Sequence, residues 1–189
     1  MTLSYKILTM TESELEKLKY PIGRMPEKSE FTSNEISANI SIIEKFPALL
    51  RAAVTGLSDG QLNTPYRLGG WTPRIIVHHV GDSHMNAFMR CKLALTEEAP
   101  VIKPYFEDRW AGLADYSATP LEVSLVLLEA LHKRWVILTR SLSNEQMLRT
   151  YIHPEYNIEF SVARLLDLYA WHSNHHLAHI TRLKEHMGW

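Results

Sequence analysis

The chain has 189 residues, and its 20 Lys and Arg side chains against 21 Asp and Glu give a formal net charge of −1. This length suits a single domain over residues 1–189 with a real apolar core. A near-neutral chain argues against nucleic-acid binding, which normally needs a basic face. No apolar run approaches the roughly 20 residues of a membrane span.

The N-terminal residues lack the basic and apolar regions of a signal peptide. The single cysteine, Cys91, cannot form an internal disulfide, which suits a reducing compartment. We therefore expect a cytoplasmic protein.

The first predicted elements are a short charged helix over residues 12–19 and an extended arm over residues 20–30. A long helix follows, in which Pro47 predicts a kink. Its apolar side chains recur mostly at three- and four-residue steps, as on one helix face: Ile36, Ile40, Ile43, Leu50, Val54 and Leu57.

Capping patterns predict where the next two long helices begin. Thr72 can cap the second, with Pro73 at its first position and an end near residue 95. The third is predicted to begin with Thr119 as cap, Pro120 at the first position and Glu122 completing a capping box.

Between the third and fourth helices, residues 149–161 predict two short β segments around a turn at His153–Asn157. Such a hairpin is marginally stable alone, so it must pack against the helices. The fourth helix should begin near Ser161 and end at Gly188. The predicted fold is therefore an all-α four-helix bundle with one small β-hairpin.

The apolar seam of the fourth helix contains two histidines, His172 and His176. They lie one turn apart, so both imidazoles can reach one ion. An unpaired buried polar group costs about 1–3 kcal/mol, so a buried imidazole needs a hydrogen-bond partner or a metal. One such histidine would more simply be a core residue, but two on one seam favour a metal site. The seam repeats at three- and four-residue steps: Val162, Leu165, Tyr169, His172, His176, Ile180, Leu183 and Met187.

The second helix offers a third ligand in the pair His78 and His79. Adjacent helical residues point about 100° apart, so at most one of them faces the ion. Periodicity favours His79 without excluding His78, which lines up with Met85 and Met89 and suits packing. The face of His79 turns from apolar to polar, as in a cleft or on a solvated surface: Ile75, Ile76, Asp82, Ser83, Asn86 and Arg90.

The other histidines have less definite predicted roles. His179 lies close to the seam and could orient a ligand. His132 could face the same cavity, although its place beside Trp135 favours a core role. His175 points away from the seam. The remaining three are predicted at the surface or in loops: His84, His153 and His186.

Several runs of the sequence resemble one known family. They are TPYRLGGWTPRIIVHHVGDSHMN, KLALTEEAPVIKPY, HPE and YAWHSNHHLAHI, with YPIG near the start and a terminal MGW. From Tyr20 to Trp189 the chain resembles the YfiT-like branch of the DinB superfamily, whose members are described as metal-dependent hydrolases or bacillithiol S-transferases. The resemblance implies a cytoplasmic homodimer with a four-helix bundle. It also implies one Zn2+ or Ni2+ ion per chain, held by His79, His172 and His176.

Three neutral imidazoles leave an open coordination position, which is typical of a catalytic site. In a first interpretation, the ion binds the sulfur of a small-molecule thiol such as bacillithiol, and the thiolate attacks an electrophilic substrate. Basic side chains near the motifs could hold the carboxylates of the thiol: Arg67, Arg74, Arg90 and Lys103.

The alternative is a hydrolase, in which a metal-bound hydroxide attacks an ester or amide and Asp82 or His179 assists as base or acid. No HExxH motif supplies a built-in glutamate, which favours thiol transfer. A third possibility is a metal-binding module without catalysis. The open coordination position argues against this third possibility, so we expect a thiol S-transferase, with hydrolysis as the alternative. The residues do not decide which metal is native.

Overall fold

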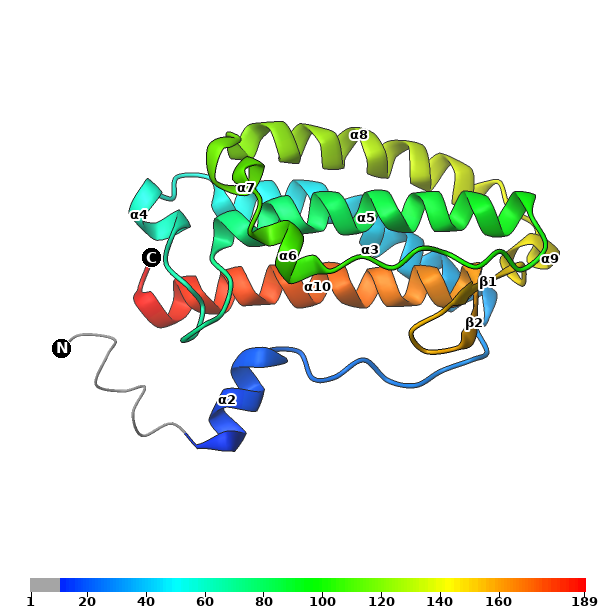
Figure 1. Cartoon of the computed structure of the whole chain (residues 1–189), viewed down its shortest axis with the longest axis horizontal. Helices are drawn as coiled ribbons and strands as arrows, with labels where there is room; N and C mark the ends of the chain where they lie inside the picture. Colours follow the sequence, from blue (N-terminus) through cyan, green and yellow to red (C-terminus); the bar gives the residue numbers. More distant parts are fainter. Residues whose placement is uncertain (1–10) are drawn as a thin grey trace.

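The computed structural model describes residues 11–189, and four long helices form its body (Figure 1). The expectation about a signal peptide rests partly on residues 1–10, which lie outside this range. None of the helices in residues 11–189 has the length and hydropathy of a membrane span. The long helices are α3 (Ser33–Val54), α5 (Pro73–Thr96), α8 (Leu121–Arg140) and α10 (Val162–Met187).

Five short helices and a hairpin complete the description and confirm the predicted bundle with its hairpin between the third and fourth long helices. The short helix α2 was predicted, whereas the others were not. These elements are α2 (Glu12–Lys19), α4 (Asp59–Leu62), α6 (Glu107–Ala111), α7 (Ala114–Ala118), α9 (Asn144–Met147), β1 (Thr150–His153) and β2 (Ile158–Ser161).

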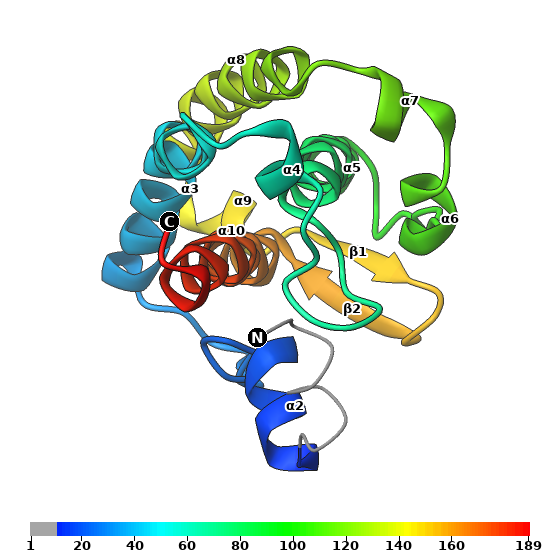
Figure 2. The ribbon, with the colours of Figure 1, turned by 90° about the vertical axis from the view of Figure 1, so that its left-hand side faces the viewer.

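The four long helices pack in a ring, with α3 lying diagonally from α5 (Figure 2). Helix α3 contacts α8 and α10, and α5 contacts the same two helices. The pairs His78–Ser124 and His84–His132 follow the same order along α5 and α8, so these neighbours are parallel. Parallel neighbours need a long return connection, and residues 97–120, with α6 and α7, provide it.

The predicted ends of α5 and α10 are confirmed. Thr72 and Ser161 are the N-caps, and each side chain accepts a backbone N–H of the first turn. Helix α10 ends at Gly188, whose φ of 71° suits a residue without a Cβ atom. Helix α3 is continuous across Pro47.

The predicted start of α8 is wrong by one residue. Thr119 ends α7, where its backbone N–H donates to the Asp115 carbonyl, and Pro120 is the N-cap, with no side-chain cap. The Glu122 carboxylate accepts hydrogen bonds from Arg51 of α3 and so does not close a capping box. A competing partner on a neighbouring helix thus replaces the local interaction.

The hairpin is anchored to the bundle by the crossover after α5. The backbone N–H of Ile102 donates to the carbonyl of Ile152 at 3.0 Å, and the N–H of Ile152 donates to Pro100 at 2.9 Å. On β1, Tyr151 and His153 alternate with half-buried residues and are buried. His153 is therefore buried at the end of a strand, which corrects the prediction of a surface or loop position.

A layer of histidines separates two apolar clusters inside the bundle. One cluster contains Ala87, Trp135 and Tyr169, and the other contains Val80, Leu128 and Ile180. On α5, α8 and α10 the buried or half-buried histidines of this layer fall between those positions in the sequence: His84, His132, His172 and His176. The candidate site is therefore framed by the core rather than by surface loops.

Candidate metal centre

Three histidines from two helices converge: His79 of α5, and His172 and His176 of α10, which belong to this layer. Each can offer one ring nitrogen such that all three atoms lie within 4.8 Å of one another. The Nε2 of His172 lies 3.4 Å from Nε2 of His79 and 3.1 Å from Nε2 of His176. His79 and His176 are buried and His172 is half-buried.

These separations fit a divalent ion. Zinc–nitrogen bonds of 2.0–2.1 Å in a tetrahedral site place neighbouring ligand nitrogens about 3.3–3.4 Å apart. Two of the three separations lie near this value and the third is within 4.8 Å, so an ion held by the three nitrogens would keep a fourth position open. Cys91 is fully buried in the apolar core, where burial raises the pKa of its thiol to about 11, so it is not a ligand here. The three residues therefore fit the ion, and their role as its ligands stays a prediction.

Burial keeps these imidazoles neutral, which is the state that binds a metal. Desolvation lowers the pKa of His79 to about 4. It also lowers the pKa of His172 and His176 well below the usual range, and the neighbouring histidines lower it further. Near pH 7 all three rings can present a lone pair.

A chain of hydrogen bonds fixes the tautomer of His172. The Ile43 carbonyl can only accept, so Nδ1–H of His132 donates to it at 2.6 Å and Nε2 of neutral His132 must accept. Nδ1–H of His84 then donates to His132 over 2.7 Å, and Nδ1–H of His172 donates to Nε2 of His84 over 3.1 Å. The Nε2 lone pair of His172 is thereby left facing His79 and His176.

His84 is fully buried in this chain, which corrects its predicted surface position. The sequence did hold a signal for this, because His84 occupies an apolar seam of α5 just as His172 occupies that of α10. The buried residues of that seam follow three- and four-residue steps: Val77, Val80, His84, Ala87, Cys91 and Ala94. His132 is buried too, and it has the core position that was favoured for it.

The loop before α5 covers the centre. The Trp71 ring lies 4.5 Å from the ring of His79 and 6.1 Å from that of His176, nearly parallel to the latter at 12°. This loop turns tightly at Gly70, where a Cβ atom would lie 2.6 Å from Cγ of Arg67. The two glycines that precede Trp71 thus let the backbone bring the indole onto the histidines.

The other polar candidates near these motifs have partners of their own. Asp82 accepts a hydrogen bond from the Tyr116 hydroxyl at 2.7 Å, and burial raises its carboxyl pKa. His78 pairs with Ser124 of α8, in the packing role predicted for it. Nε2 of His179 lies 3.2 Å from the Lys19 carbonyl, to which it donates, so this residue does not orient a ligand through that nitrogen.

Two histidines lie where the helical pattern placed them, away from the centre. His175 stacks on Trp171, with ring centroids 4.4 Å apart, on another face of α10. His186 is exposed in the last turn of that helix.

The four basic candidates differ in their surroundings. Arg74 pairs with Asp59 and Asn63, and Arg67 donates to the Leu68 carbonyl at 2.9 Å. Lys103 is exposed. Arg90 is 9% exposed, and within residues 11–189 its guanidinium has no hydrogen-bond or ion-pair partner.

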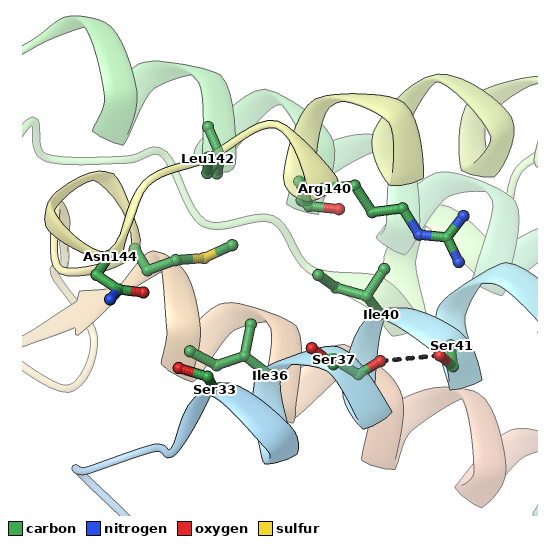
Figure 3. Close-up of a pocket in the computed structure, with 10 residues that line it drawn as sticks. Ser33, Ile36, Ser37, Ile40, Ser41, Arg140, Leu142 and Asn144 are labelled. Carbon is green, nitrogen blue, oxygen red and sulfur yellow. Dashed lines mark hydrogen bonds between the residues drawn. The ribbon is translucent and has the colours of Figure 1, made fainter.

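A surface pocket elsewhere has no comparable chemistry (Figure 3). It encloses about 280 Å3 between α3, the end of α8 and α9, with Ser33, Ser37, Ser41 and Asn144 among its polar lining. Its one charged side chain, Arg140, pairs with Glu44 at 2.6 Å. The histidine layer is therefore the stronger candidate site.

Comparison with known proteins agrees with this geometry. A family model described as the DinB superfamily matches residues 42–180. A Bacillus cereus protein named "Putative metal-dependent hydrolase" is 51% identical over 175 residues, which cover 93% of this chain and all of the relative. A protein of Oceanobacillus iheyensis with the same description is 52% identical, with 90% and 98% coverage.

A solved structure shares the fold. YfiT from Bacillus subtilis, described as "a probable metal-dependent hydrolase with an unusual four-helix bundle topology", is 45% identical and has a TM-score of 0.89. The match covers 92% of this chain and 99% of YfiT. With these relatives and the family match over most of its length, the chain belongs to the YfiT-like branch of the DinB superfamily.

Proposed function

We propose that this protein is a metal-dependent hydrolase whose divalent ion is held by His79, His172 and His176. The observation that carries the proposal is the convergence of three Nε2 atoms at separations that suit a tetrahedral ion with an open position. A divalent ion in such a site lowers the pKa of a bound water to about 7 and that of a thiol further still. Relatives that match 90–93% of this chain carry the name of such hydrolases.

The chain's own side chains would prepare the site rather than supply the nucleophile. The bonds from Ile43 through His132 and His84 hold the His172 ring with its Nε2 lone pair toward the centre. Trp71 covers His79 and His176 and keeps bulk water off their rings.

Thiol transfer of the bacillithiol type is a second candidate, and one observation favours it. Among the described residues, the group that could hold a metal contains no carboxylate beside the three histidines. Asp82 is bonded to Tyr116 and His179 to the Lys19 carbonyl, so neither is poised as a general base. A thiol needs no such base, because the ion itself would favour the thiolate.

The two functions can be separated with zinc-loaded and nickel-loaded full-length protein. We expect 4-nitrophenyl acetate to be hydrolysed in a reaction that EDTA abolishes and added metal restores. If instead a thiol is conjugated to monochlorobimane only when the metal is present, and no ester is turned over, the protein is a transferase. The His186→Ala variant is the matched control, because His186 is exposed in the last turn of α10. Equal activity in His172→Ala and wild type would contradict both functions.

A further inference from the structure

The N-terminal segment, residues 11–31, lies outside the ring of long helices. Its helix α2 has no buried residue, and both ribbon views place it beside α10 (Figure 1, Figure 2). Two of its backbone carbonyls accept hydrogen bonds from α10: Lys19 from Nε2–H of His179 at 3.2 Å, and Pro26 from Arg164 at 3.3 Å. An exposed helix of eight residues has little stability of its own, so such contacts hold the segment in place.

His179 lies between this segment and the loop that covers the metal centre. The face of its ring stacks on Tyr66, with centroids 4.1 Å apart and planes at 26°. Its Nε2–H donates to the Lys19 carbonyl. The residue is 4% exposed, so both contacts are made by a buried ring. The face and the edge of one imidazole therefore hold two separate segments of the chain.

Tyr66 and Trp71 close the loop that lies before α5. The backbone N–H of Tyr66 donates to the Trp71 carbonyl at 3.2 Å, and the N–H of Gly70 donates to the Arg67 carbonyl at 3.0 Å. Residues 66–71 thus form a compact turn with its ends bonded together, which moves as one unit. The position of the Tyr66 ring therefore affects where the Trp71 indole lies over the centre.

His179 can also reach the centre directly. Its ring lies 5.6 Å from the ring of His176, one of the three candidate ligands. A change at His179 can therefore act on the ion by two routes, through Tyr66 or through His176. Substitutions at Tyr66 separate these routes, because they leave the His176 contact in place.

We propose that His179 is a positioning residue that couples the N-terminal segment to the cover of the metal centre. Donation to the Lys19 carbonyl fixes the imidazole, the imidazole fixes Tyr66, and the closed loop holds Trp71 over the ion. The closed cover then slows the escape of the ion and the entry of bulk water. This inference rests on the proposed function, because it requires an ion at the three histidines.

The test measures how fast nickel-loaded full-length protein releases its ion to excess EDTA. The ion leaves when the cover opens, so a weaker cover contact raises the release rate. Tyr66→Leu removes the aromatic stack and should speed release about 2- to 10-fold, which corresponds to the loss of one aromatic pair. Tyr66→Phe is the matched control, because it keeps the ring, and it should release nickel at the wild-type rate.

Two substitutions at His179 separate its two contacts. His179→Phe keeps a ring against Tyr66 and removes the donor to Lys19, whereas His179→Gln keeps a donor near the position of Nε2 and removes the ring. Each should speed release about 2- to 10-fold, as expected for one hydrogen bond or one aromatic pair. Because the two contacts act in series, adding His179→Phe to Tyr66→Leu should give no further increase.

A second measurement follows the N-terminal segment in metal-free protein. Trypsin can cleave after Lys17, Lys19 and Arg24, and cleavage needs the segment to detach locally. His179→Phe should raise the cleavage rate at these sites about 2- to 10-fold, and His179→Gln should restore a rate close to wild type. Mass spectrometry of the products identifies the sites.

Three results would overturn the proposal. Two of them are wild-type release rates in Tyr66→Leu or in His179→Phe. The third is an additive effect in the double variant, which would show that His179 acts on the ion through His176 alone. Failure of the proposed function looks different, since wild-type protein would then not hold nickel through the three histidines while the trypsin result persisted.

Discussion

Two groups of neighbouring histidines inside the bundle differ in what their ring nitrogens face. In the outer group, His79, His172 and His176 turn Nε2 atoms toward one another. In the inner group, His84 and His132 use both nitrogens in hydrogen bonds that end on the Ile43 carbonyl. Burial alone therefore does not identify a metal site; the direction of the unused lone pairs does.

The hydrogen bonds of the inner group also determine the tautomer of His172 in the outer group. A neutral imidazole has one donor and one acceptor, so each bond in the chain from the Ile43 carbonyl decides the next. The chain ends by making Nδ1 of His172 a donor and Nε2 a free lone pair. The outer group is thus the candidate metal site, and the inner group holds one of its rings in place. Substitutions in each group should therefore have different effects.

The largest expected effect comes from the outer group. His79→Ala, His172→Ala and His176→Ala should each lower metal affinity by more than about 100-fold, since losing a mere supporting partner already costs 10–100-fold. Metal content by mass spectrometry, together with the metal-dependent reaction, measures this loss. Full metal content in all three variants would show that the outer histidines do not bind the metal.

A smaller loss of metal but a larger loss of stability is expected for His84→Ala. It leaves Nε2 of His132 and Nδ1 of His172 buried without their partner, at about 1–3 kcal/mol each. Metal affinity should fall about 10–100-fold because the His172 ring is no longer held. Urea unfolding measures the change in the free energy of unfolding, and a zinc titration measures the change in zinc affinity. An unchanged zinc affinity would mean that the inner group does not support the outer one.

The pH dependence of stability tests the inner group next. Burial lowers the pKa of His132 to about 4, below its value of about 6.5 in the unfolded chain. The unfolded state therefore binds this proton first, so its contribution to stability is present above pH 6.5 and is lost as the pH falls toward 4.

The matched variant for this test is His132→Phe. Its urea-unfolding free energy should fall less steeply between pH 6.5 and 4, by up to about 1.4 kcal/mol per pH unit. Parallel curves for the two proteins would show that His132 is protonated equally in both states.

The smallest effect is expected at the cover of the outer group. Trp71→Phe keeps an aromatic ring over His79 and His176 and should cost about 1 kcal/mol. The variant also tests where Ni2+ binds. The Trp71 indole lies 4.5 Å from the His79 ring, so added Ni2+ should quench mainly the fluorescence of Trp71. Quenching of the same size in the variant would mean that the ion binds elsewhere.

The long helices, the hairpin and the pair of histidines on α10 were predictable because each leaves a local periodic signal. His172 and His176 stand on an apolar seam, and the same reasoning applied to α5 would have found His84. The start of α8 could not be predicted, because the Glu122 carboxylate can accept either from the local backbone or from Arg51 of α3. In the folded protein it accepts from Arg51. The parallel direction of α5 and α8 was equally hidden, because periodicity gives faces and not the order of packing.

The candidate site divides in the same way. Helical periodicity predicts that His79 and Arg90 share a face of α5. Whether Arg90 has a partner depends on which side chains surround it in the folded protein, and the sequence does not show this. The bond from His179 to the Lys19 carbonyl joins residues 160 positions apart and leaves no local trace.

The most direct test of the metal centre is X-ray absorption spectroscopy at the metal edge of the zinc-loaded protein. We expect three imidazole nitrogens and one further oxygen ligand near 2.0–2.1 Å, with one imidazole fewer in His79→Ala. A sulfur ligand, or a wild-type spectrum with fewer than three imidazoles, would contradict the three-histidine centre.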